Sequence, residues 1–250
     1  MRRLALFILC AAGFAQTQTI SRPSFSEPSL NPARDEIAFV SGGDIWTVPL
    51  SGGEARLLIS HPATESRPRF SPDGKKIAFT STRTGSGNVY VLDIGSGILK
   101  RLTFDDVAES VDGWSPDGKY IYFTTASKDV TSETDIFRVN VDGGTPMAAA
   151  ADRFVPEFFA AAGPADGTIA FCAKGGMAYG QWWRHGHSHI DESEIWIKRA
   201  GKYEKISGGP GARELWPMWA ADGKKLYFVS DRSGSENIWR SPSATALRSR

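Results

Sequence analysis

Apolar residues recur along the chain in a column that repeats at long intervals. Five phenylalanines, each with an Ile or Leu two positions before it, are spaced by 40, 44, 48 and 57 residues: Phe39, Phe79, Phe123, Phe171 and Phe228. Short segments that alternate apolar and polar positions are typical of β-strands with one buried face. Units that resemble one another at a period of 40 to 50 residues are typical of radial or stacked repeats. The column therefore predicts one strand of a repeated β unit.

A tight turn precedes this column in three of the units. It contains the pairs Asp73-Gly74, Asp117-Gly118 and Asp222-Gly223. Glycine after aspartate supplies the positive φ that a hairpin needs, so each pair predicts a turn between two antiparallel strands. The three aspartates are thereby explained as turn residues rather than as catalytic carboxylates.

A third strand follows the column in every unit, as a polar residue, an Ile or Val, and an aromatic residue. These aromatic residues are Trp46, Tyr90, Phe137, Trp196 and Trp239. A second glycine-containing turn and a short fourth strand follow in most units. Four antiparallel strands per unit predict an all-β fold, a β-propeller whose blades stack through their aromatic residues.

The repeat divides residues 27–250 into about five blades. The expected boundaries are 27–63, 66–109, 110–152, 153–214 and 215–250. The last unit lacks a second glycine turn and a fourth strand. Because incomplete blades leave exposed strand edges, we expect this chain to be the front part of a longer parent protein. The alternative is a propeller that closes in an unusual way.

Composition narrows the possible partners. Of the 250 residues, 41% are hydrophobic, and the formal net charge is +1. Nucleic-acid-binding domains carry a basic footprint, so nucleic acid is not an expected partner. No cofactor is predicted, and association into a homo-oligomer is left open.

The N-terminus has the pattern of an export signal. Residues 1–15 combine two arginines, an apolar run and small residues before a cleavage point, which predicts a secretory signal peptide, with 16–26 as a linker. The apolar run is too short for a membrane span. We expect an exported protein, periplasmic or secreted, whose one remaining thiol, Cys172, is a buried apolar side chain.

Residues 70–81, FSPDGKKIAFTS, and 229–239, VSDRSGSENIW, resemble the WD40-like repeat of the TolB propeller and of tricorn-type peptidases. Residues 180–196, GQWWRHGHSHIDESEIW, are similar to the N-terminal propeller of exported tricorn-like peptidases of the S41 group. The resemblance implies a propeller that gates or recognises peptide or protein substrates. In that family, a separate C-terminal part with PDZ and catalytic domains supplies the serine nucleophile.

No catalytic residue is predicted within this chain. It contains no Gly-x-Ser-x-Gly, His-Glu-x-x-His or phosphate-loop motif. The resemblance then implies gating or recognition of substrates for a serine peptidase whose chemistry lies outside these residues. The alternative is a TolB-like periplasmic scaffold that binds proteins and has no enzymatic role.

An insertion at about residues 174–193 interrupts the fourth unit and concentrates unusual residues. Three interpretations stay open: packing at the channel mouth, contact with substrate, and metal binding. The candidate substrate-contacting residues are Trp182, Trp183, Arg184, His185, His187 and His189. The candidate metal ligands are His185, His187, His189 and Asp191, which alternate and so share one side of an extended segment.

Two arginines occupy equivalent loops, Arg83 in the second unit and Arg232 in the fifth. Because the same residue recurs in equivalent loops, we expect both arginines to stabilise the blade. The alternative is that they line a face where a peptide carboxylate enters.

Overall fold

The computed structural model describes residues 24–128, 133–151, 155–165, 167–173 and 192–241. The regular elements in these residues are β-strands. In chain order they are β1 (Ser26–Leu30), β2 (Glu36–Ser41), β3 (Asp44–Pro49), β4 (Arg56–Ile59), β5 (Glu65–Phe70), β6 (Lys76–Ser81), β7 (Asn88–Asp93), β8 (Leu99–Arg101), β9 (Glu109–Trp114), β10 (Tyr120–Thr125), β11 (Asp135–Asn140), β12 (Met147–Ala150), β13 (Glu157–Ala162), β14 (Ile169–Ala173), β15 (Glu194–Arg199), β16 (Lys202–Ser207), β17 (Glu214–Trp219), β18 (Leu226–Ser230) and β19 (Asn237–Arg240).

Consecutive strands pair into antiparallel sheets that form the blades of a propeller. Strands β1–β4 form blade 1, β5–β8 blade 2, β9–β12 blade 3, β13–β16 blade 4, and β17–β19 a three-stranded blade 5. The prediction of an all-β propeller with four-stranded antiparallel blades and an incomplete last blade is confirmed.

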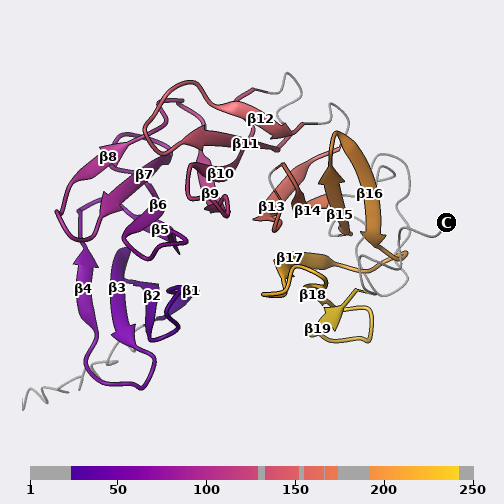
Figure 1. Ribbon diagram of the computed structural model, residues 1–250, viewed down its shortest axis with the longest axis horizontal. Coiled ribbons are helices and arrows are strands. Elements are labelled where there is room, and N and C mark those ends of the chain that lie inside the picture. The colour runs from indigo at the N-terminus through magenta and orange to yellow at the C-terminus, as the bar shows by residue number, and fades with distance from the viewer. Residues whose placement is uncertain (1–23, 129–132, 152–154, 166, 174–191, 242–250) are drawn as a thin grey trace, which may run out of the picture.

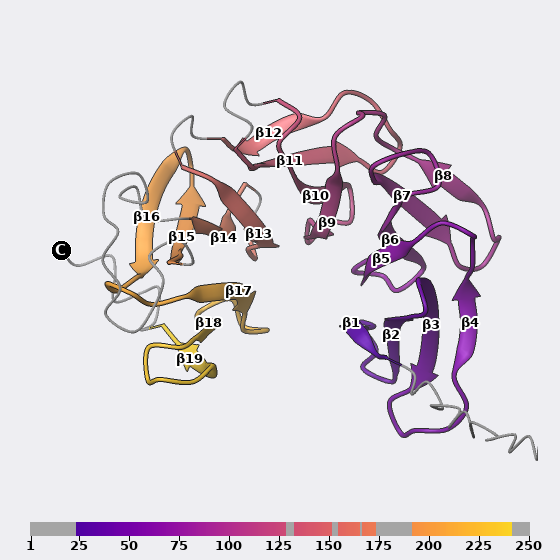
Figure 2. The ribbon, with the colours of Figure 1, turned by 180° about the vertical axis from the view of Figure 1, so that it is seen from behind.

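The blades follow one another around an open arc (Figure 1). The first strand of each blade lies on the inner side of the arc, and the fourth strands lie on the outer side. First strands of neighbouring blades contact one another, from β1 to β5 and onward to β17. The reverse view shows the same opening between blade 1 and blade 5 (Figure 2). The inner strands therefore form a continuous wall around the axis.

The five phenylalanines that repeat along the sequence occupy the same pairing position in every blade. In every blade the column phenylalanine on the second strand pairs with the aromatic residue of the third strand: Phe39 with Trp46, Phe79 with Tyr90, Phe123 with Phe137, Phe171 with Trp196 and Phe228 with Trp239. Phe79, Phe123 and Phe171 are at most 1% exposed. Among the third-strand aromatic residues, Tyr90 and Phe137 are buried in seam clusters, and Trp196 and Trp239 pack against such clusters. The predicted core packing is confirmed for these four residues, whereas Trp46 is half-buried.

The Asp-Gly pairs form the expected hairpin turns. Gly74, Gly118 and Gly223 have φ values of 71°, 70° and 65°, a region that strains residues with a Cβ atom. In the turn of blade 2, Asp73 Oδ1 accepts hydrogen bonds from the Ser71 hydroxyl (2.6 Å) and the Lys75 backbone N–H (3.1 Å). The bond from Ser71 is the main reason that the pKa of Asp73 is lowered. The aspartates are turn residues, as predicted.

The hydrophobic core consists of a cluster at each seam between neighbouring blades. At the first seam, Ala38, Val40 and Ile45 of blade 1 pack against Ile77, Phe79 and Tyr90 of blade 2. Equivalent clusters fill the other three seams. Blades 2, 3 and 4 thus bury both faces against their two neighbours, because a lone sheet would leave both in water.

Two indole hydrogen bonds link neighbouring blades near the axis. Trp114 Nε1 donates to the Arg69 carbonyl oxygen of the preceding blade at 2.8 Å, and Trp219 Nε1 donates to the Ala161 carbonyl oxygen at 3.1 Å. Both tryptophans are the last residue of an inner strand. The same contact therefore recurs at two seams.

Three blades begin at a glutamate that lies slightly before the boundary expected from the sequence. Glu65, Glu109 and Glu214 open the inner strands of blades 2, 3 and 5, whereas the turn pattern placed them just outside or at the end of the preceding blade. The expected insertion lies between β14 and β15. In the part of the chain that the structure describes, no helix has the length and apolar character to cross a membrane.

Candidate functional site

The sequence-predicted site residues lie outside the described residues. This holds for Trp182, Trp183, Arg184, His185, His187, His189 and Asp191. Their expected contacts with substrate or metal therefore stay predictions. Among the residues that the structure describes, no group of three or more His, Cys, Asp or Glu side chains is placed to hold a metal ion.

The inner strands share a backbone distortion at the axis. Each contains a β-bulge, where one extra residue interrupts the register with the second strand. In four strands the bulge holds a non-glycine residue with positive φ: Glu27 (53°), Arg67 (53°), Phe159 (55°) and Trp216 (53°). Bulges re-aim side chains, and left-handed non-glycine residues concentrate at functional sites. Because this strained backbone conformation recurs, we take the inner strands β1, β5, β9, β13 and β17 as the candidate site and call them the axial wall.

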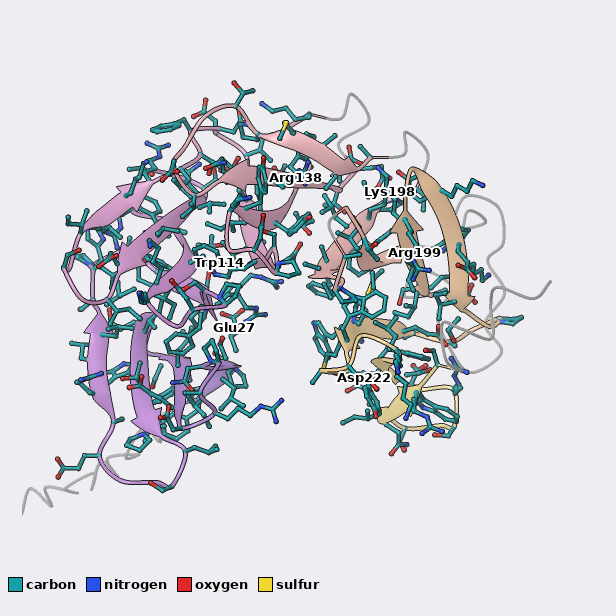
Figure 3. All side chains as sticks on the ribbon, viewed as in Figure 1. Glu27, Trp114, Arg138, Lys198, Arg199 and Asp222 are labelled. Carbon is teal, nitrogen blue, oxygen red and sulfur yellow. The ribbon has the colours of Figure 1, made fainter. Side chains whose placement is uncertain are left out.

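Arg67 joins three blades across the wall. Its backbone N–H donates to Glu27 Oε2 of blade 1 at 2.5 Å. Its side chain reaches blade 3, where Nε donates to the Val111 carbonyl oxygen at 2.5 Å and Nη2 to Asp112 Oδ1 at 2.7 Å. Figure 3 places Glu27 on the inner side of the arc. One half of the wall is therefore a network of charged groups.

Asp112 is the buried anion of this network. Its side chain is fully buried, and Oδ2 accepts a hydrogen bond from the Thr124 hydroxyl at 2.7 Å. Burial raises the pKa of Asp112, an effect that Arg67 opposes. Burial also lowers the pKa of Arg69, whose Nε donates to the Asp112 carbonyl oxygen at 3.0 Å.

The other half of the wall is aromatic. The Arg67 guanidinium lies 5.2 Å from the centre of the Phe159 ring. The Phe159 ring centre lies 5.8 Å from that of Trp216. Trp216 is 45% exposed and Met218, on the same strand, is 42% exposed. The wall thus changes from charged to aromatic between blades 1 and 5 and ends in accessible apolar surface.

Cys172 lies behind the aromatic half. It is a free, fully buried thiol that accepts a hydrogen bond from the Trp216 backbone N–H. Burial raises its pKa far above the ordinary value, so the thiol stays protonated and unreactive. The prediction of a small buried apolar side chain is confirmed.

Arg83 and Arg232, which occupy equivalent loops, each form an ion pair with a buried glutamate of the same blade. Arg83 Nη2 lies 2.9 Å from Glu65 Oε1, and Arg232 contacts Glu214 in the same way. Each guanidinium also packs on the aromatic residue of its third strand, at 5.0 Å from the Tyr90 ring centre and 4.8 Å from that of Trp239. These contacts account for the two arginines as blade architecture.

Sequence reasoning missed the bulge residues because they follow no hydrophobic period. A signal was present, since Arg67, Phe159 and Trp216 each stand two residues after a buried glutamate that opens the inner strand: Glu65, Glu157 and Glu214. The spacing marks the bulge position but not the direction of its side chain.

Comparison with known proteins identifies the family of this propeller. The model of the tricorn protease N-terminal beta propeller domain matches residues 24–249. The chain belongs to this family. This tricorn propeller is 29% identical over 227 residues to tricorn protease homolog 1 of Streptomyces coelicolor, an alignment that covers 84% of the chain and 19% of that relative. It therefore spans about a fifth of the length of that relative.

Solved structures agree with the fold of the tricorn propeller. The crystal structure of the tricorn protease superposes with a TM-score of 0.66 at 25% identity, covering 86% of this chain and 21% of that one. TolB from Acinetobacter baumannii superposes with a TM-score of 0.61 at 23% identity, covering 90% and 55%. The likeness to TolB shows a shared fold.

Proposed function

We propose that this tricorn propeller is the substrate-recognition or gating domain of an exported serine peptidase of the S41 type. The catalytic groups of that peptidase would be supplied by a part outside these residues, with PDZ and catalytic domains. Membership in the tricorn N-terminal propeller family supports the kind of parent protein. Residues 1–15 carry the signal pattern that supports export to the periplasm or beyond.

The observation that carries the recognition role is the axial wall. An unfolded peptide offers backbone amides, charged groups and apolar side chains. The wall offers the partly exposed Trp216 and Met218. The Phe159 ring lies between Trp216 and the guanidinium of Arg67, which is paired with Asp112. Tryptophan and arginine are among the residues on which binding energy concentrates at interfaces. We propose that peptide substrates contact Trp216 and Phe159 as they pass along the axis.

The insertion in blade 4 adds a second proposal. Trp182, Trp183, Arg184 and the three histidines His185, His187 and His189 carry aromatic and cationic groups suited to peptide contact. Loops that interrupt a repeat carry binding residues in many repeat proteins. We propose that this segment contacts the same substrates.

Peptide binding by the purified chain tests the recognition role. The probe is a fluorescein-labelled tryptic digest of casein, followed by anisotropy. Trp216→Ala is expected to weaken binding about tenfold, as loss of an interface anchor worth about 1.4 kcal/mol does. The matched control is Tyr203→Ala, an aromatic side chain that is 42% exposed on the outer strand of blade 4, and it should bind as the wild type does.

If both variants bind the peptides with the same affinity, Trp216 is not part of the binding site. Absence of peptide binding, together with tight binding of a folded envelope protein, would favour the TolB-like scaffold role instead.

A further inference from the structure

Arg69 is a cation of the axial wall whose hydrogen bonds go to uncharged groups. It is the last but one residue of the inner strand β5 and is half-buried. Two hydrogen bonds hold its guanidinium: Nε donates to the Asp112 carbonyl oxygen at 3.0 Å, and Nη1 donates to the Pro68 carbonyl oxygen at 2.9 Å. Among the residues that the structure describes, no carboxylate forms an ion pair with Arg69.

The carboxylates nearest to Arg69 are engaged elsewhere. Asp112 Oδ1 is paired with Arg67 at 2.7 Å, and Oδ2 accepts a hydrogen bond from the Thr124 hydroxyl. Glu27 Oε2 accepts the backbone N–H of Arg67. Burial and the charge of Arg67 lower the pKa of Arg69, and Asp112 and Glu27 oppose this effect only in part. The positive charge of Arg69 is therefore incompletely compensated by its surroundings.

The two carbonyl bonds leave most of the Arg69 donors available. A guanidinium carries five N–H donors in one plane, and Nη2 of Arg69 has no hydrogen-bond partner among the described residues. Two parallel N–H groups match the two oxygens of a carboxylate. Because Nε and Nη1 are already held, the plane of the guanidinium is fixed before any ligand binds, which reduces the entropy lost on binding.

Free space lies beside this guanidinium. Gly113 follows the residue whose carbonyl group Arg69 contacts, and a Cβ atom at Gly113 would meet no described atom within 4 Å. Gly113 is also the last but one residue of its inner strand. The residues at this position are Ser29, Arg69, Gly113, Ala161 and Met218. Arg69 is the charged member of this set, and its neighbour in the next blade has no side chain.

We infer that the Arg69 guanidinium, beside the open space at Gly113, binds the carboxylate of an acidic side chain in a peptide that passes along the axis. The inference rests on the recognition role proposed above and names a class of residue that this role selects. Met218 holds the same strand position in blade 5 and is 42% exposed. We therefore expect preferred peptides to combine acidic and apolar residues.

Competition against the labelled casein digest tests this preference. The competitors are two peptides with acetylated N-termini and amidated C-termini, one with four repeats of Leu-Ser-Glu and one with four repeats of Leu-Ser-Gln. Blocked ends remove the terminal carboxylate as a source of binding. At low salt the wild-type chain should bind the glutamate peptide about tenfold more tightly, as expected for a hydrogen-bonded ion pair, and added salt should reduce the ratio.

Variants at the two positions locate the preference. Arg69→Gln removes the charge and should bind both peptides equally. Gly113→Glu places a carboxylate in the free space while Arg69 stays in place, and it should also abolish the preference. The matched controls are Gly113→Ala, whose Cβ atom meets no described atom, and Arg56→Gln, on the outer strand β4 with a side chain 70% exposed. Both controls should keep the wild-type ratio.

Thermal unfolding at the wild-type temperature establishes that each variant is folded. If the wild-type chain binds the digest but does not distinguish the two peptides, the inference is wrong and the recognition role stands. If neither the digest nor the peptides bind, the recognition role fails and the inference fails with it. A tenfold preference that persists in folded Arg69→Gln or Gly113→Glu would place the acidic-residue site elsewhere and overturn the assignment.

Discussion

Arg67 and Asp112 form an ion pair between two neighbouring blades, with Nη2 2.7 Å from Oδ1 and the carboxylate fully buried. The guanidinium of Arg67 also stacks on the ring of Phe159, which belongs to blade 4. Removing one partner of a buried pair leaves an uncompensated charge, which typically costs about 3–5 kcal/mol. The pair should therefore be a main determinant of how the inner strands stay together.

Asp112→Ala is expected to lower the free energy of unfolding by about 3–5 kcal/mol, because Arg67 loses its buried counter-ion. Urea unfolding followed by tryptophan fluorescence measures this loss. Lys119→Ala is the control, since the Lys119–Asp117 pair has side chains 70% and 44% exposed, and such pairs contribute under about 1 kcal/mol. Similar losses in both variants would contradict the role given to Asp112.

Glu109→Gln tests a buried carboxyl group whose Oε1 has no hydrogen-bond partner among the described residues. Burial raises the pKa of Glu109, so the folded protein holds this proton more tightly than the unfolded chain does. Its contribution to stability is therefore retained below the ordinary glutamate pKa and falls as the pH rises through the raised value.

The stability of Glu109→Gln relative to the wild type should accordingly increase from about pH 4 to about pH 7. Urea midpoints measured across this range follow the difference, and Glu54→Gln, at an exposed position, controls for the amide substitution. A difference that shrinks with rising pH would contradict the raised pKa.

Gly223→Ala is expected to be more harmful than Gly118→Ala. Both glycines have positive φ, so both substitutions carry strain of about 1 kcal/mol. A Cβ atom at position 223 would lie 2.5 Å from Pro164 Cγ of the preceding blade, whereas one at position 118 would lie 3.8 Å from Pro72 Cδ. Overpacking adds about 1–3 kcal/mol, and thermal unfolding should separate the two variants by that amount.

Export predicts a defined mature end. Cleavage after Ala15 would leave Gln16 as the first residue. The intact mass of protein recovered from the periplasm or medium measures this end, with a chain lacking residues 1–15 as the reference. A full-length mass in a cytoplasmic fraction would contradict the signal peptide.

Calorimetry can test the metal interpretation of His185, His187, His189 and Asp191 against the other two. Imidazole and carboxylate groups are zinc ligands. If the metal interpretation holds, calorimetric titration with Zn²⁺ should release heat that His187→Ala reduces strongly. His61→Ala, the remaining histidine of the chain, is the control. Titration without heat would remove the metal interpretation and leave packing or substrate contact.

The sequence by itself determined the blade. The repeated phenylalanine position, such as Phe39, follows from the local alternation of apolar and polar residues, and the Asp-Gly turns follow from the positive φ of glycine. Strand order, register and the buried aromatic residues were therefore predictable. Local rules also explained Asp73 and Cys172. They gave no account of the contacts that the inner strands make around the axis.

Only the tertiary structure decided the axial wall and the burial of each repeat position. Glu27, Arg67 and Phe159 come together because bulges lie in separate strands around one axis. The glutamate spacing marks a bulge in the sequence but does not tell where its side chain points. Ile195 and Ile238 occupy the same position of the repeat, yet one is buried and the other exposed. Burial at that position is set by the neighbouring blade, which depends on how the repeats stack in space.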